Sequence, residues 1–505
     1  MKTIKYYSVC AISALAFLFP SCDERLDVDL PDNLATSNFW RNQSDAESGL
    51  AAVYSKLECA TDPWEFSEVR FPVETYRDDL CQMGSDALNY KDWVELYNFT
   101  YINTNTQFSN YWATYYSGIL FANQVMEKAA PINMDETYKK EILAEARFLR
   151  ALYHMRLLLN WNQIIVRDQY IESESMINKA LSSREEAWDF IINDFEKAVL
   201  DLADKQPLDK LGRATKGAGY AYLGFSYLTR AYEEPAKTAE YLAKAETAFN
   251  GVKGYGLVKN YLSMFDGTNK NSEESVFELQ FTDNTANGAE YRTVIHKWIG
   301  VSELGGWDEI TPSRFLLDEF KKEGKVATTG RYDSRLYATM FFNDEYFNDV
   351  DAKRVYDKTF IERFNNNPDK LAFRKYLPPT TAEMNKSRVA VNVPLMRYAD
   401  VLLMKAEVLN ELGRTQEAIP LINEVRKRAD MPALSLSLNK ESVREKIEHE
   451  RIVEFALENT RFYDLRRWNK AQSALQAVGR TGFDPSKHNF YPIPYNEIKS
   501  NNMVK

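Results

Sequence analysis

Apolar residues recur at steps of three and four positions along most of this 505-residue chain, the pattern of amphipathic helices. The first such segment starts near residue 44, where Ser44 or Asp45 is the predicted N-cap. Its apolar positions are Ala46, Leu50, Val53 and Leu57. Further helices are predicted over residues 111–130, 138–162 and 184–202. The chain is therefore predicted to be mainly α.

Two segments have the residue spacing of tetratricopeptide helix pairs, in which a small residue lets two helices approach closely. The signature positions of the first pair are Leu223, Gly224, Tyr227, Ala245 and Phe249, with an enlarged turn between the helices. The second pair, over 406–432, is the better match. Packing explains all of these positions, so they predict a tetratricopeptide-like helical-repeat scaffold and not a chemistry.

Two stretches lack this helical rhythm. Residues 60–105 are predicted to be long loops. Residues 251–395 are rich in Gly and Asn, with short β-like runs such as ESVFELQFT, and are interpreted as an inserted, loop-rich irregular subdomain. The helical scaffold then covers 44–250, and 396–505 forms a C-terminal helical-repeat part with a closing segment. Binding residues are commonly carried by loops on a rigid scaffold, so they are expected in these two stretches.

The N-terminus has the features of an export signal. Lys2 and Lys5 precede a mostly apolar stretch over residues 9–19. Eleven residues are too few to span a membrane but have the length of a signal h-region. No other stretch of eighteen apolar residues occurs. Residues 1–21 are therefore predicted to be a signal peptide.

Cys22 follows this segment directly, after the small residue Ser21. This placement predicts lipidation of Cys22 and an acidic tether over residues 22–43. Phe19 and Pro20 replace the usual Leu-Ala or Leu-Ser, and ordinary cleavage nearby is the alternative.

The chain is acidic and rich in aromatic residues. Its formal net charge is −10, and loss of Lys2 and Lys5 with the signal would leave −12. Such a chain lacks the general electrostatic footprint of a nucleic-acid-binding protein. Aromatic residues make up 13% of the chain, which predicts a core of large side chains and a surface that stacks on flat ligands.

The sequence contains four cysteines, and Cys10 would be lost with the signal. A four-cysteine zinc site is therefore excluded. Cys59 and Cys81 either form a disulfide or remain buried thiols.

Catalytic motifs are missing from the sequence. The four histidines are scattered, at His154, His296, His449 and His488. There is no H-E-x-x-H, P-loop, G-x-G-x-x-G or G-x-S-x-G sequence. A carboxylate pair for glycoside hydrolysis stays open, because its spacing is spatial. The chain is predicted not to be an enzyme.

Several blocks together resemble the SusD/RagB family of Bacteroidota outer-membrane lipoproteins. The most specific are PLMRYADVLLMKAEVLNELG and ERIVEFALENTRFYDLRRWNK, and SCDERLDVDLP is similar to the family's lipidated start. YPIPYNEIKSN matches the closing segment, although the usual Gln-Asn-Pro-Gly-Tyr ending is absent. The resemblance runs nearly end to end.

This resemblance implies a nutrient-binding role without catalysis. It implies surface capture of a glycan and delivery to a SusC-like TonB-dependent transporter. The protein is expected in the outer membrane, held by its N-terminal lipid and facing outside the cell. No cofactor or nucleic-acid partner is predicted, and a structural calcium ion is not indicated. Two alternatives stay open: a peptide or glycopeptide binder of the same fold, and a helical-repeat adaptor for protein partners.

The C-terminal block also has a physical interpretation. Residues 447–467 carry alternating charges at Glu450, Arg451, Glu454, Arg461, Asp464, Arg466 and Arg467. Arg–carboxylate pairs can be bidentate and can hold one helix against another. The block has no nucleophile, so a structural role is predicted.

Tryptophans outside the helical rhythm supply the candidate binding site. A flat indole face matches the apolar face of a pyranose, and neighbouring polar groups can bond its hydroxyls. The candidate ligand-binding residues are Trp93, Trp307, Trp298, Trp64, Tyr90, Asp78 and Asp79. Trp307 and Trp93 lead this set. The alternative for each is a packed loop anchor.

Overall fold

The computed structural model describes residues 39–59, 70–283 and 291–504. The chain divides into two compact units, residues 1–41 and 42–505. In the first unit, the described residues include Phe39 and Trp40, whose ring centroids lie 5.1 Å apart. All elements discussed below belong to the second unit.

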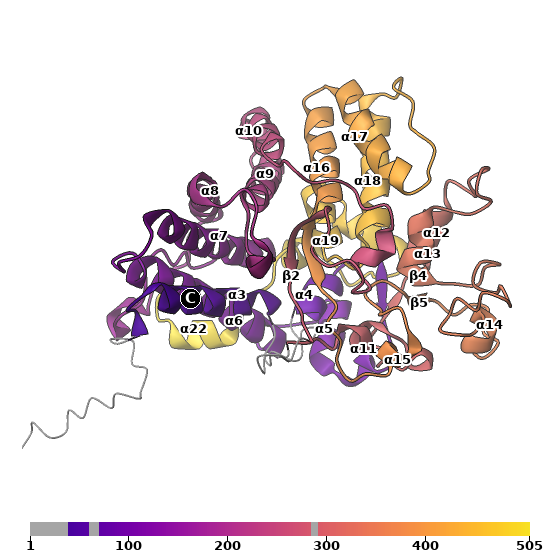
Figure 1. Cartoon of the computed structure of the whole chain (residues 1–505), viewed down its shortest axis with the longest axis horizontal. Helices are drawn as coiled ribbons and strands as arrows, with labels where there is room; N and C mark the ends of the chain where they lie inside the picture. The colour runs from indigo at the N-terminus through magenta and orange to yellow at the C-terminus, as the bar shows by residue number, and fades with distance from the viewer. Residues whose placement is uncertain (1–38, 60–69, 284–290, 505) are drawn as a thin grey trace, which may run out of the picture. The chain divides into compact units, whose positions relative to one another are not determined.

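The helices carry the labels of Figure 1. They are α3 (Gln43–Tyr54), α4 (Arg70–Thr75), α5 (Lys91–Asn98), α6 (Thr106–Lys128), α7 (Glu136–Asn160), α8 (Arg184–Asp201), α9 (Lys216–Glu233), α10 (Thr238–Asn250), α11 (Ile295–Ile299), α12 (Arg314–Lys321), α13 (Ser334–Thr339), α14 (Phe360–Arg363), α15 (Thr381–Met384), α16 (Tyr398–Glu411), α17 (Thr415–Arg428), α18 (Lys440–Phe455), α19 (Arg461–Arg467), α20 (Ala471–Ala477), α21 (Pro485–His488) and α22 (Tyr495–Ser500). The strands are β1 (Cys81–Met83), β2 (Ser275–Leu279), β3 (Ile310–Pro312), β4 (Met340–Phe341), β5 (Ala372–Phe373) and β6 (Val393–Arg397).

Long helices packed against their chain neighbours form the scaffold. Helix α6 packs on α7, α7 on α8, α8 on α9 and α9 on α10 (Figure 1). Helix α10 then contacts α16, which packs on α17 and α18. The predicted mainly helical, tetratricopeptide-like fold is confirmed.

Sequence periodicity located these helices because each buries an apolar face. The helices predicted over 111–130, 138–162 and 184–202 correspond to α6, α7 and α8. The predicted cap of α3 was wrong. Asn42 is the N-cap, because its side-chain oxygen accepts a hydrogen bond from the Asp45 backbone N at 3.2 Å.

The predicted close approach at Gly224 is confirmed between α9 and α10. A Cβ at this position would lie 2.5 Å from Cε1 of Phe249. The ring of Phe249 thus occupies the space that any larger residue at 224 would need. This contact sets how closely the two helices pack.

The stretches without helical rhythm contain short elements. The β-like run ESVFELQFT forms β2, which pairs antiparallel with β6, Ser275 opposite Arg397. Strand β6 leads directly into α16 and so ties this segment to the scaffold. The prediction of long loops fails over 70–105, because this stretch forms α4, β1 and α5.

Candidate functional site

Two of the tryptophan candidates are interior side chains on short helices. Trp93 on α5 is 6% exposed, and Trp298 on α11 is 1% exposed. Their ring centroids are 6.3 Å apart, and the ring of Tyr76 lies 6.3 Å from Trp93 and 5.9 Å from Trp298. In this packed arrangement the two indoles act as a base for other side chains.

Tyr90 lies on this base and faces solvent. Its side chain is 47% exposed. Its ring centroid is 4.4 Å from that of Trp93, with the planes inclined by 32°. The contact orients an aromatic ring that is partly exposed.

Trp307 is the second exposed aromatic residue here, at 44%. Its backbone N donates a hydrogen bond to the Lys297 carbonyl at 2.7 Å. The Lys297 ammonium in turn donates to the carbonyls of Gly305, at 2.8 Å, and Met384, at 2.6 Å. The loop that carries Trp307 is thereby held against α11 and the end of α15.

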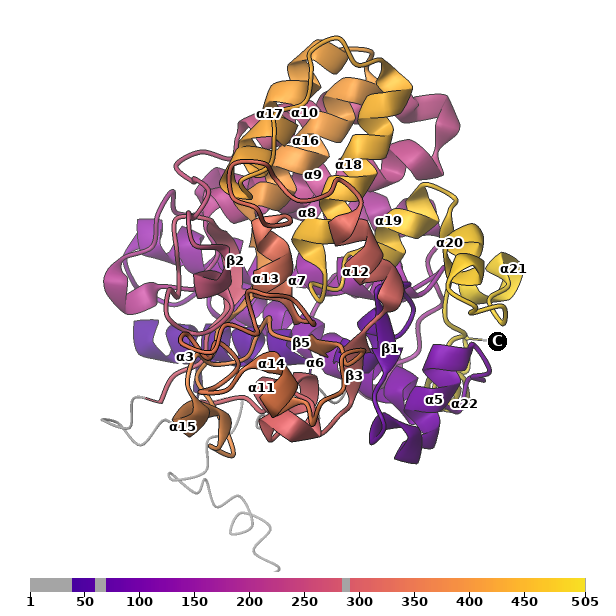
Figure 2. The ribbon, with the colours of Figure 1, turned by 90° about the vertical axis from the view of Figure 1, so that its right-hand side faces the viewer.

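The two segments that carry Tyr90 and Trp307 meet at the end of the β1–β3 ladder. The Gly84 N donates to the Glu309 carbonyl at 2.9 Å, and the Asp86 N donates to the Asp308 carbonyl at 3.2 Å. Figure 2 shows the ladder with α12 at one end and α11 near the other. We call the exposed rings of Tyr90, which lies against Trp93, and of Trp307 the aromatic platform.

Polar side chains adjoin the platform. Asp86 accepts a hydrogen bond from the Asn89 amide at 2.9 Å, and Asp308 accepts one from the Ser302 N at 3.0 Å. Burial, together with the neighbouring carboxylates of Asp86 and Asp308, raises the pKa of Glu309 to about 8. Burial and these two neighbours thus favour the protonated form of Glu309, and Asp86 and Asp308 are the partly exposed acceptors beside the rings.

The structure places Asp78 and Asp79 in the interior, away from a ligand on the platform. Both Asp79 oxygens accept hydrogen bonds from Arg461, each at 2.8 Å. Asp78 accepts one from the Leu80 N, and burial, with the charge of Asp79, raises the pKa of Asp78 to about 7. These acids organise the protein interior. Trp64 and the lipidation candidate Cys22 lie outside the described residues.

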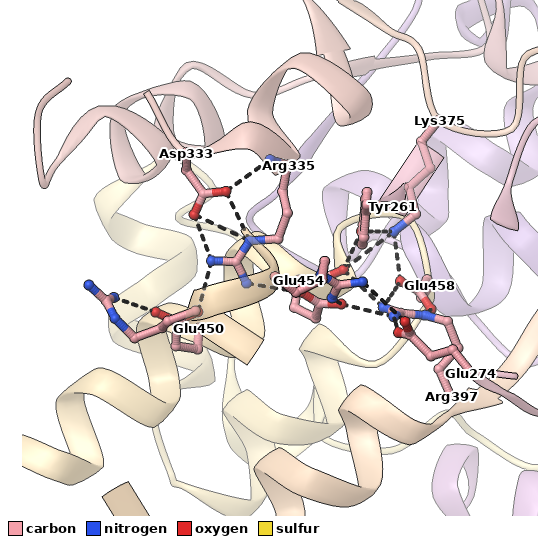
Figure 3. Close-up of polar contacts among 11 residues, drawn as sticks. Tyr261, Glu274, Asp333, Arg335, Lys375, Arg397, Glu450, Glu454 and Glu458 are labelled. Carbon is pink, nitrogen blue, oxygen red and sulfur yellow. Dashed lines mark hydrogen bonds and ion pairs between the residues drawn. The ribbon is translucent and has the colours of Figure 1, made fainter. Parts of the chain in front are cut away.

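A buried charge cluster joins the C-terminal helices to the irregular segment (Figure 3). Arg335 binds Asp333, Glu450 and Glu454 at 2.6–2.9 Å. Arg397 binds Glu454 at 2.8 Å and Glu458 at 2.7 Å. The side chains of both arginines are fully buried. The structural role predicted for Glu450 and Glu454 is confirmed.

The partners of the cluster were not predictable from the C-terminal block alone. Arg335 lies on α13, Arg397 ends β6 and Glu274 precedes β2, far from Glu454 in sequence. Burial alone would raise the pKa of Glu454, but Arg428, Arg397 and Arg335 hold it well below its ordinary value. The carboxylate is thus charged, and its charge is balanced by arginines.

Lys375 is a buried cation at the edge of this cluster. Its ammonium contacts the Glu458 carboxylate at 2.6 Å and the Tyr261 hydroxyl at 2.7 Å. Burial lowers the pKa of Lys375 to about 8; Glu458 opposes this shift and Arg397 adds to it. Desolvation prevails although an acidic partner is present.

We predict that this lysine makes stability rise between about pH 8 and the ordinary lysine pKa of about 10.4. In that window the unfolded chain holds a proton that the folded chain has released, so raising the pH favours folding. The gain approaches roughly 3 kcal/mol across the window. Urea unfolding at stepped pH should show wild type gaining stability relative to Lys375→Met. If the free energy of unfolding changed with pH in the same way in both proteins, the assignment of this pH dependence to Lys375 would be contradicted.

The described ranges 39–59, 70–283 and 291–504 also bear on other classes of site. Cys59 and Cys81 are buried free thiols and not a disulfide. No group of three or more His, Cys, Asp or Glu side chains in these ranges is placed to hold a metal ion. None of the helices in the same ranges is long and apolar enough to cross a membrane.

Two family models match the chain in successive parts. A model described as "SusD family" matches residues 273–505. A model described as "Starch-binding associating with outer membrane" matches residues 31–228. SusD-like protein P2 of Formosa agariphila is 25% identical over 506 residues, which cover 94% of this chain and 95% of that protein.

Solved structures share the fold over almost their whole length. A SusD superfamily protein from Bacteroides vulgatus has a TM-score of 0.80 and 26% identity, covering 92% of this chain and 99% of that one. A laminarin-binding SusD-like protein has a TM-score of 0.72 and 25% identity, with coverage of 92% and 99%. Sequence and fold thus match the same group of proteins.

Proposed function

Because the chain belongs to the SusD/RagB family, we propose that it captures a glycan at the outer membrane without catalysis and delivers it to a partner TonB-dependent transporter. The family description of starch binding and outer-membrane association supports this function, as does the similarity to a laminarin-binding protein. The lipid on Cys22 is the proposed anchor, and the glycan-binding face is turned outward.

The aromatic platform is the observation that carries the proposal. Tyr90 and Trp307 expose 47% and 44% of their surface, although large aromatic side chains are usually packed inside. The Tyr90 ring is oriented by its contact with Trp93, and the backbone of Trp307 is held by its bond to Lys297. A preorganised flat surface of this kind binds sugar rings with little loss of side-chain freedom.

Weak affinity follows from this geometry and suits delivery. Two stacking contacts contribute about 1 kcal/mol each, and hydrogen bonds from hydroxyls to Asp86 or Asp308 largely replace bonds to water. A sum of a few kcal/mol corresponds to a dissociation constant on the order of millimolar. A glycan held so weakly leaves readily for the transporter.

The test is titration calorimetry of the chain against laminarin, starch and other neutral polysaccharides, with a peptide panel in parallel. Tyr90→Ala and Trp307→Ala should each weaken binding about fivefold, since each removes about 1 kcal/mol of stacking. Tyr495→Ala is the matched control, because Tyr495 is 48% exposed on α22 and should leave affinity unchanged.

Four outcomes would overturn parts of the proposal. Heat with peptides and none with any sugar would favour the peptide-binding alternative. Release of reducing sugar during incubation would show catalysis. Equal losses in Tyr90→Ala and Tyr495→Ala would remove the platform from the binding site. Failure to co-purify with a TonB-dependent transporter from the native outer membrane would contradict delivery.

A further inference from the structure

A second pocket lies at the opposite end of the β1–β3 ladder from the aromatic platform. It has a volume of about 350 Å³ and is lined by residues of α12, α18, α19 and α20. Asp79, which precedes β1, and Phe315, which follows β3, both line it. We call it the Phe315 pocket.

The wall of this pocket contains a guanidinium with an unused donor. Arg461 is fixed by its two bonds to Asp79, and its side chain is 5% exposed. Its Nη1 has no hydrogen-bond partner among the described residues and lies 3.9 Å from a carboxylate oxygen of Glu448. A buried donor without an acceptor costs free energy, so an acceptor oxygen entering here is favoured.

The other charged groups of the pocket are nearly balanced. Lys470 pairs with Glu448, and Glu319 accepts a hydrogen bond from His449 at 2.7 Å. Glu445 is exposed and makes no ion pair within the described part of the chain. The pocket thus has three lysine or arginine cations, Lys322, Arg461 and Lys470, against four carboxylates, Asp79, Glu319, Glu445 and Glu448. This balance disfavours an anionic ligand and suits a neutral one rich in hydroxyls.

An apolar surface accompanies these polar groups. The ring of Phe315 is half-buried, and Ile452, Ala474 and Ala477 complete the apolar lining. One aromatic face with several fixed acceptors and a donor is the combination that holds a sugar ring: the ring stacks and its hydroxyls find partners.

We propose that the Phe315 pocket is a second saccharide subsite, which takes a neutral sugar unit of the same glycan chain that lies on the aromatic platform. The proposal rests on the proposed glycan-binding function. Asp79 and Asp86 mark the two ends and are seven residues apart in sequence. Extended backbone of that length spans about 23 Å at most. A short oligosaccharide therefore fills one subsite, and a longer one reaches both.

The consequence is an affinity that rises with chain length and then levels off, because the second contact becomes intramolecular. The experiment titrates the chain with a size series of oligosaccharides cut from the polysaccharide that gives the largest heat. For wild type we expect the longest members to bind about tenfold more tightly than the shortest. In Phe315→Ala this ratio should fall to about twofold, while affinity for the shortest members is unchanged.

Two further variants separate binding from folding. Glu445→Gln alters an exposed side chain and should weaken binding of long chains only, by about threefold. Phe225→Ala is the control. Phe225 is also half-buried but lies on α9, and its replacement should leave the length dependence intact. An unchanged length dependence in both Phe315→Ala and Glu445→Gln overturns the second subsite but leaves capture on the platform standing. No binding by any oligosaccharide overturns the proposed function and the subsite with it.

Discussion

Replacing Arg397 by methionine is expected to lower the free energy of unfolding by about 3–5 kcal/mol. The arginine side chain is fully buried, and its guanidinium binds Glu274, Glu454 and Glu458. Methionine fills part of the volume but leaves these carboxylates in the interior with one fewer cation. Removing one partner of a buried ionic group is costly because the remaining charge stays desolvated.

Arg414→Met is the matched control for this change. Arg414 also pairs with two carboxylates, Glu246 and Glu417, but its side chain is 41% exposed. Water replaces the lost partner there, so we expect a loss of less than about 1 kcal/mol. Urea unfolding monitored by tryptophan fluorescence would compare the two variants. Equal losses of unfolding free energy in Arg397→Met and Arg414→Met would mean that burial does not make the charge cluster more important for stability than an exposed ion pair.

The sequence predicted the scaffold because long amphipathic helices display their burial as periodicity. It failed for α4, where Arg70, Phe71, Pro72, Val73, Glu74 and Thr75 are all buried. Its polar residues Arg70 and Glu74 pair with each other in the interior and do not face solvent, and six residues are too few to show a period. Helix α5 has eight residues and is also too short to show a period, so the sequence predicted a loop there.

The candidate site was predictable as a region but not as a set of exposed side chains. The four tryptophan candidates had the same sequence signature, yet Trp298 is 1% exposed and Trp307 is 44% exposed. Exposure is decided by long-range packing, here by Tyr76 and Trp93 against Trp298. No local pattern carries that information.

The environment of the acidic residues was equally unpredictable from the sequence. Asp79 resembled a ligand group because it lies in an aromatic-rich stretch, but Arg461, 382 positions later, occupies both of its oxygens. The Phe315 pocket likewise combines residues from α12, α18, α19 and α20 with one that precedes β1. Such sets form only when the chain folds.

Gly84→Val is expected to weaken glycan binding by about 30-fold, more than the loss of either exposed aromatic residue alone. A Cβ at Gly84 would lie 1.8 Å from the Asp308 carbonyl oxygen and 2.4 Å from its carbon. These are backbone atoms and cannot turn away as a side chain can. The segment 84–90 and the Trp307 loop must therefore separate, with loss of the bonds from Gly84 to Glu309 and from Asp86 to Asp308.

Separation removes the fixed spacing between Tyr90 and Trp307, so a glycan can stack on neither ring without first ordering the loops. Loss of both contacts of about 1 kcal/mol each corresponds to about 30-fold in affinity.

Gly256→Val is the control, because a Cβ there meets nothing closer than 3.9 Å. Calorimetry measures the affinity, and far-UV circular dichroism with thermal unfolding verifies that the helical scaffold persists. A folded Gly84→Val protein that binds like wild type would show that the platform acts as two independent rings. A loss of affinity greater than that of Tyr90→Ala or Trp307→Ala would show that the spacing of the two rings is itself recognised.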